Sequence, residues 1–183
     1  MAGGLGRFKS ILEEYGGLAA WTVGIGAAPF VAMFASLAPP WPIDIAPLTA
    51  VAQLAVLVLI YQLLNTSPKR VINRVVVSSF CGVFAIGLIY IAILLNFTYQ
   101  PQDSARRQAR GFACTQIAET QYPDKCPFLG WDELNEVEYN PARLWTEGSI
   151  IAVETTLLVI WTIAFMAITT LLGSFVIYQK RME

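Results

Sequence analysis

The sequence predicts an all-α integral membrane protein with four transmembrane helices, cytoplasmic N- and C-termini, and a long extracytoplasmic loop between the third and fourth helices. Hydrophobic residues make up 56% of the chain and charged residues 14%, below the roughly 25% charged fraction of soluble domains. Residues 149–178 carry a single charge, Glu154, and this stretch is longer than the ~30 Å core of a bilayer requires. The 183 residues are expected to form one domain, residues 1–183.

The apolar stretches are separated by turn signals, and an amphipathic lead at residues 1–17 precedes the first. Pro39-Pro40-Trp41-Pro42 ends the first stretch. A residue before proline disfavours the helical conformation, and tryptophan is frequent at the headgroup level of a membrane. The expected spans are residues 18–37, 46–64, 75–95 and 149–178.

Small side chains recur at four-residue spacing in two of these spans. In the third span the pair is Ser78 and Gly82, and the nearby Cys81 is expected to be a packed thiol. Ridges of small residues let two helix backbones approach closely, which favours helix packing in lipid. They predict a homo-oligomer, and a chance pattern in an alanine-rich helix is the alternative. The ridge of the first span consists of Ala20, Gly24, Ala28, Ala32 and Ser36.

The basic residues indicate the orientation of the chain. Cytoplasmic connections of membrane proteins carry an excess of lysine and arginine. Seven of the twelve lysines and arginines of this chain lie in three segments: the lead, the connection at residues 65–74 and the tail after residue 178. We therefore expect a multi-pass protein of a bacterial inner membrane with both termini inside. The net charge of −1 gives no indication of nucleic-acid binding. The seven basic residues are Arg7, Lys9, Lys69, Arg70, Arg74, Lys180 and Arg181.

The loop at residues 96–148 is the one sizeable polar region, and it contains Cys114 and Cys126. On the oxidising side of the membrane these cysteines are expected to form a disulfide. Closing a loop of about 13 residues stabilises a fold by roughly 3 kcal/mol in the chain-entropy model. A redox-active pair and two reduced thiols are the alternatives. Local helices are expected at residues 104–120 and 132–138, with Asp132 as a cap of the second.

Two polar residues lie within predicted spans. Gln53 is the polar residue in the middle of the second span, and we expect it to form a hydrogen bond with another helix; a pore-lining role is the alternative. Glu154 lies about one turn inside the fourth span, where a carboxylate is costly and is by default a functional candidate. Its partner could be Gln53 or a loop arginine. Alternatively, Glu154 lies at the outer interface and reaches water or Arg143, handles protons or cations, or holds subunits together.

The residue types that are missing narrow the range of functions. The chain has no histidine, the commonest metal ligand and the usual general base near neutral pH. It also has no glycine-rich phosphate loop, no zinc-ligand spacing, no Ser/His/Asp set and no CxxC motif. The sequence therefore predicts no catalytic residues, no cofactor and no metal site, and a protein that is not an enzyme.

Four spans with a long outer loop that carries Cys114 and Cys126 resemble the DsbB and vitamin K epoxide reductase families of quinone-linked thiol oxidases. The resemblance implies that this pair corresponds to the loop cysteines of DsbB. In those families the short first loop carries a CxxC pair that receives the electrons. Here that loop reads Ala38-Pro39-Pro40-Trp41-Pro42, so the electron path to quinone is interrupted and the relationship is one of topology.

The layout also resembles KwaA, the four-span membrane component of the bacterial Kiwa anti-phage system. Chain length, four spans, internal termini and the lack of catalytic residues carry this resemblance. It implies a membrane homo-oligomer that works with a soluble cytoplasmic partner. We therefore expect a non-enzymatic scaffold or sensor that couples envelope events to such a partner. The alternatives are an ion channel or proton-linked carrier that uses Glu154 and Gln53, and a degenerate DsbB-like thiol oxidoreductase.

Overall fold

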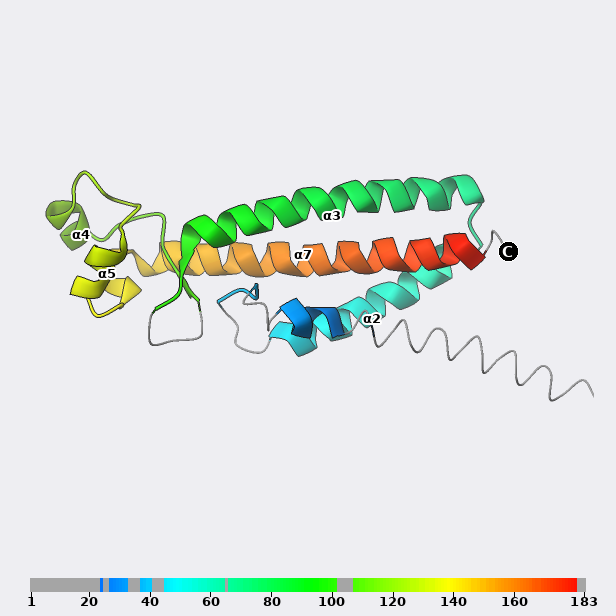
Figure 1. The fold of residues 1–183 in the computed structure, drawn as a ribbon, viewed down its shortest axis with the longest axis horizontal. Coiled ribbons are helices and arrows are strands. Elements are labelled where there is room, and N and C mark those ends of the chain that lie inside the picture. The colour runs from blue at the N-terminus through cyan, green and yellow to red at the C-terminus, as the bar shows by residue number, and fades with distance from the viewer. Residues whose placement is uncertain are drawn as a thin grey trace, which may run out of the picture.

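The structure is a computed structural model that describes residues 24, 27–32, 37–40, 45–64, 66–101 and 107–180. Three long helices dominate it: α2 (Ile45–Leu64), α3 (Lys69–Phe97) and α7 (Glu147–Lys180). Each of them is long and apolar enough to cross a membrane. A small loop domain, which we define as residues 98–101 and 107–146, lies at one end of these helices (Figure 1).

Helix α7 is the centre of the bundle, because it packs along both α3 and α2. The chain runs along α2 away from the loop domain, turns at residues 66–68 and returns along α3 to the loop domain (Figure 1). We call the end with the turn the basic end, because α3 starts there with Lys69 and Arg70. The other end is the loop end. One buried cluster joins the helices near the loop end, and a smaller one, with Leu64, Ile72 and Ile177, joins them at the basic end.

The three predicted spans at residues 46–64, 75–95 and 149–178 correspond to α2, α3 and α7. Helix α3 starts six residues earlier than predicted and so includes the basic turn. Of the first predicted span, residues 24 and 27–32 are helical and Leu37 is not. The remainder of that span, with Ala20 and Ser36, lies outside the described residues, as do the lead and Arg181, so a fourth span stays a prediction.

Large apolar side chains cover the outward faces of the long helices. A soluble protein rarely exposes so large a contiguous apolar surface, whereas a helix in lipid must do so. This surface and the length of the helices are consistent with a membrane protein. The exposed side chains include Leu48, Val51, Val58, Leu63, Val77, Phe80, Phe84, Leu88, Leu95 and Ile163.

The loop domain is built from short elements. Strand β1 (Thr98–Tyr99) directly follows α3 and pairs antiparallel with β2 (Gln108–Ala109). Three short helices follow: α4 (Gln116–Gln121), α5 (Trp131–Glu136) and α6 (Pro141–Leu144). Their shared core consists of Tyr99, Cys114, Ala118, Leu129, Leu134, Leu144 and Trp145.

Of the local predictions for the loop, the helix at residues 104–120 is confirmed only from residue 116 on, as part of α4, and the predicted cap of the second helix is wrong. Residues 107–115 are not helical, because β2 pairs with β1, and α4 starts only after Thr115, whose hydroxyl accepts a hydrogen bond from Ala118 N at 3.3 Å. The predicted cap Asp132 is instead in the first turn of α5. The helix starts after Gly130, whose N–H donates to the Glu133 carboxylate at 2.8 Å, so the carboxylate three residues later supplies the capping interaction.

Candidate functional site

The predicted disulfide between Cys114 and Cys126 is confirmed, with the two Cα atoms 6.2 Å apart. Cys114 pairs with Trp145 in an isolated β-bridge, so the disulfide ties the segment after α4 to the segment that leads into α7. The Trp145 side chain is fully buried, and its indole N–H donates to Pro127 O at 2.9 Å. The two halves of the loop are therefore joined around this tryptophan by a disulfide and by hydrogen bonds.

The loop domain is fixed to the start of α7 by close contacts. The backbone N–H of Thr146 donates to Ala113 O at 2.9 Å, and the Ser149 hydroxyl also reaches Ala113 O, at 3.2 Å. Gly111 lies so close to this junction that an added Cβ would be 2.1 Å from Ser149 Oγ and 2.6 Å from Trp145 Cβ. Only a residue without a side chain fits there, so glycine permits the close approach.

Acidic residues of α5 are occupied by neighbours within the loop domain. The Lys125 ammonium donates to the Glu133 carboxylate, which lowers the pKa of Glu133 and raises the pKa of Lys125. The Tyr122 hydroxyl donates to Glu136, and this hydrogen bond raises the pKa of Tyr122 to about 12. These contacts brace α5 against the segment after α4. No group of acidic or cysteine side chains suited to a metal ion occurs among the described residues.

Polar side chains join α2 to α7 at two depths within the bundle. Gln53 Nε2 donates to Thr169 Oγ1 at 3.1 Å, and Trp161 Nε1 donates to Thr49 Oγ1 at 3.1 Å. All four residues are buried. Gln53 Oε1, however, is buried without a hydrogen-bond partner. Gln53 thus makes a hydrogen bond between helices, and its side chain is closed off from solvent.

The depth of Glu154 follows from the pairing of α3 with α7. The rings of Tyr90 and Trp161 lie 5.8 Å apart, and the two helices run in opposite directions. Phe97, the last residue of α3, lies seven residues after Tyr90, and Glu154 lies seven residues before Trp161. Both therefore lie about 10 Å from that ring contact, in the direction of the loop end. Glu154 is therefore level with the end of α3 and next to the polar loop domain.

Among the described residues, neither Gln53 nor a loop arginine pairs with Glu154; the loop arginine Arg106 lies outside them. Thr169, the partner of Gln53, is fifteen residues further along α7, which corresponds to about 22 Å. Between described residues the one ion pair joins Lys125 to Glu133, so Glu154 and Arg143 are not paired either. Gln53 and Glu154 do not form a shared polar site.

The small residues divide into two groups. Ala28 and Ala32 pack against the buried cluster near the loop end. Gly24 and Gly82 have nothing within 4 Å of an added Cβ, and Ser78 is exposed, with its hydroxyl turned to Val75 O of its own helix. The face of α3 around Ser78 and Gly82 is therefore not used for packing by the described part of the protomer. The neighbouring Cys81 is exposed, which corrects the expectation of a packed thiol.

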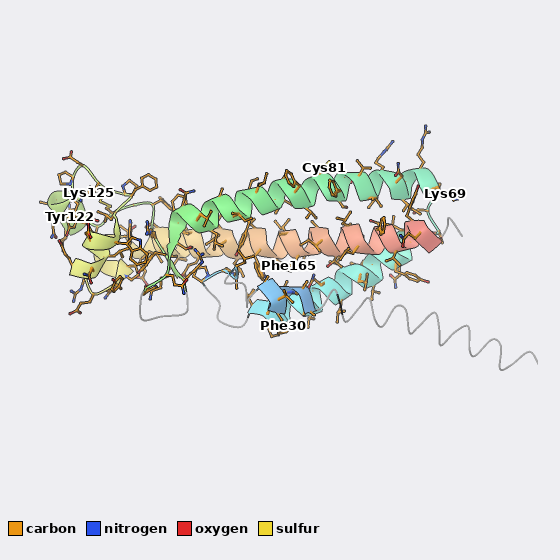
Figure 2. All side chains as sticks on the ribbon, viewed as in Figure 1. Phe30, Lys69, Cys81, Tyr122, Lys125 and Phe165 are labelled. Carbon is orange, nitrogen blue, oxygen red and sulfur yellow. A yellow bond between two sulfur atoms is a disulfide. The ribbon has the colours of Figure 1, made fainter. Side chains whose placement is uncertain are left out.

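The basic end carries the predicted cytoplasmic cations. Lys69, Arg70 and Arg74 are all exposed on the first turns of α3, and α7 ends close by, at Lys180. Figure 2 shows Lys69 at the opposite end of the molecule from Tyr122 and Lys125 of the loop domain. The three long helices thus separate two polar ends.

A group of aromatic residues and one arginine gather at the loop end, and the sequence did not predict this arrangement. The rings of Phe97 and Phe128 lie 6.3 Å apart, and those of Tyr99 and Trp131 lie 6.2 Å apart. The Arg110 guanidinium lies over the Tyr99 ring, with Cζ 5.5 Å from the centroid. The available signal was the concentration of aromatic residues just after an apolar helix, which is typical of a membrane interface.

Comparisons with known proteins do not identify a family: no family model, curated protein or solved structure matches this chain.

Proposed function

We propose that this chain is a non-enzymatic membrane sensor or scaffold whose loop domain responds to events at the envelope and whose basic end engages a cytoplasmic partner. The observation that carries the proposal is the continuity of α7. This helix has 34 residues without a break, about 50 Å in length. It starts in close contact with the disulfide-bonded domain and ends at the basic end.

Two separate signals support the orientation. The exposed Lys69, Arg70 and Arg74 at one end follow the excess of basic residues found in cytoplasmic connections. The disulfide at the other end is of a kind that persists in oxidising compartments outside the cytoplasm. Because the two features lie at opposite ends of the helices, both favour the same placement in a bacterial inner membrane.

A second copy of this chain is the partner we propose within the membrane. The Ser78 and Gly82 face of α3 is small and lacks a partner in the described protomer, and faces of this kind allow close helix packing in lipid. The resemblance to KwaA suggests anti-phage defence as the setting. In that case a bacterial strain that expresses the chain should resist phage, and the variant without the disulfide should not.

The coupling is tested by asking whether the basic end responds to the loop domain. A single cysteine replaces Lys69 in a Cys81→Ser background, and inside-out vesicles are labelled with a membrane-impermeant maleimide. We expect labelling without opening the vesicles, at a rate that changes severalfold when Cys114→Ser and Cys126→Ser are added. Ile117→Ser, at an exposed position of the loop domain, is the matched control. An unchanged rate refutes the coupling, and labelling only after the vesicles are opened refutes the orientation.

The oligomer is tested by native mass of the full chain after gentle extraction. Gly82→Leu is suited to this test because an added Cβ meets nothing within 4 Å in the protomer. We expect the variant to fold and to dissociate. If the parent and Gly82→Leu have the same native mass as oligomers, the Ser78 and Gly82 face is not the interface. If the parent is a monomer, the proposed homo-oligomeric scaffold is contradicted.

A further inference from the structure

In the part of the chain that the structure describes, the side chain of Arg110 is a cation without an acidic partner. Its Nε atom is buried and has no hydrogen-bond partner, and its contact is with the face of Tyr99. Between described residues the one ion pair is that of Lys125 with Glu133, and Glu136 accepts from Tyr122. Two acidic residues of α5, Glu133 and Glu136, are therefore engaged within the loop domain, and no described acidic residue forms an ion pair with Arg110.

Arg110 lies at the boundary between apolar helix and polar domain. Its backbone N–H donates to the carbonyl of Phe97 at 2.8 Å, and Phe97 is the last residue of α3. Phe128 and Trp131 at the same end are 68% and 47% exposed. Exposed aromatic side chains where an apolar helix ends are typical of the headgroup layer of a bilayer, so the guanidinium lies at the depth of lipid phosphates.

The guanidinium is held ready to bind an anion. Tyr99 lies beneath it, and the Tyr99 hydroxyl donates to Gln108 Oε1 at 2.5 Å and approaches Tyr139 O at 3.2 Å. The ring is therefore fixed from its far end. A partly buried guanidinium without a hydrogen-bond partner is unfavourable, and phosphate matches its planar set of donors through two parallel hydrogen bonds. An approaching phosphate would meet the terminal nitrogens of this half-buried side chain, because Nε itself is buried.

We propose that Arg110, stacked on Tyr99 at the loop end of α3, binds the phosphate group of an anionic phospholipid. This inference rests on the placement of the chain in a membrane. It is independent of oligomerisation and of any cytoplasmic partner, so it can hold where those proposals fail.

The test uses the full chain in nanodiscs of phosphatidylcholine with a minor fraction of phosphatidylglycerol, and native mass spectrometry counts the lipids that the protein retains. We expect Arg110→Gln to retain phosphatidylglycerol about tenfold more weakly, which corresponds to about 1.4 kcal/mol. Arg143→Gln, which changes an exposed arginine of the same domain, should have no effect. Arg110→Lys should give an intermediate result, because it keeps the charge and loses the planar donors.

Formation of the Cys114–Cys126 disulfide in each variant shows that the loop domain still folds. Equal retention in Arg110→Gln and the parent overturns the proposal, as does an equal loss in Arg143→Gln. Inorganic phosphate separates lipid from free anion. If added phosphate does not displace phosphatidylglycerol, the lipid assignment is supported; if it displaces the lipid at matched concentration, the site binds free phosphate and the lipid assignment is overturned.

Discussion

Replacing Gly111 with alanine should loosen the loop domain from α7. An added Cβ would be 2.1 Å from Ser149 Oγ and 2.6 Å from Trp145 Cβ. The serine hydroxyl can rotate away, but it would give up its hydrogen bonds to Ala113 O and Thr146 O. Trp145 Cβ is attached directly to the backbone of a fully buried residue, so relief there requires the backbone to move.

The expected cost follows from the general behaviour of overpacked cores. Adding a methyl group to a closely packed site typically costs about 1–3 kcal/mol, and the contact with Trp145 places Gly111→Ala within that range. A value of about 2 kcal/mol raises the population of the opened loop domain roughly thirtyfold. Adding Ser149→Ala should restore only part of this loss, because it removes the contact with Oγ and leaves the contact with Trp145 Cβ.

The disulfide provides the assay. Cys114 is 8% exposed and Cys126 is half-buried, so a reductant reaches the Cys114 sulfur mainly when the domain opens, and an increase in the reduction rate above that of the parent reports more frequent opening. In a Cys81→Ser background, gel-shift alkylation of the two released thiols measures that rate. Gly148→Ala is the matched control, since its added Cβ meets nothing within 4 Å. If Gly111→Ala is reduced no faster than Gly148→Ala, the proposed close contact is wrong.

Two further predictions concern the helix interface and the loop surface. Trp161→Phe should destabilise the protein by about 1 kcal/mol, because it removes the 3.1 Å hydrogen bond to Thr49; Gln53→Leu should cost less, since it also removes the unsatisfied buried oxygen. Thermal unfolding of both variants in the same nanodiscs tests this order. The Lys125 hydrogen bond holds the pKa of Glu133 below its ordinary 4.5, so this carboxylate stabilises the loop domain at higher pH and stops doing so as the pH falls through the lowered pKa. Reduction of the disulfide by a phosphine should therefore accelerate on acidification below pH 4.5, and a Glu133→Gln variant that retains the same acceleration would refute this cause.

The long helices and the disulfide could be predicted because each rests on a local signal. The long apolar stretch at residues 149–178 predicts a helix, and the presence of Cys114 and Cys126 in one outer loop predicts a disulfide. Residues 107–115 gave the wrong signal. Arg, Gln and Ala favour a helix by propensity, but the pairing of β2 with β1 and the close approach at Gly111 override it.

The contact between Arg110 and Tyr99 could not be predicted for a related reason. Arg106, Arg107 and Arg110 look alike in the sequence, and which of them stacks on Tyr99 depends on the register between β1 and β2. Sequence spacing likewise did not indicate that Trp161 would reach Thr49 while Gln53 would reach Thr169. Contacts between distant segments are fixed by packing, and a single sequence does not contain the packing.

The two neighbours of α7 are attached to it by different kinds of contact, and this difference determines how a displacement would travel. Facing α3, α7 presents mainly packed rings and aliphatic side chains, such as Trp161 against Tyr90. Facing α2, it also makes two directional hydrogen bonds, to Thr49 and from Gln53. A hydrogen bond holds only within narrow limits of distance and angle, so a shift of α7 by the loop domain would carry α2 with it or break these two bonds. Because α2 leads through residues 66–68 directly to Lys69, that shift would be delivered to the basic end through α2.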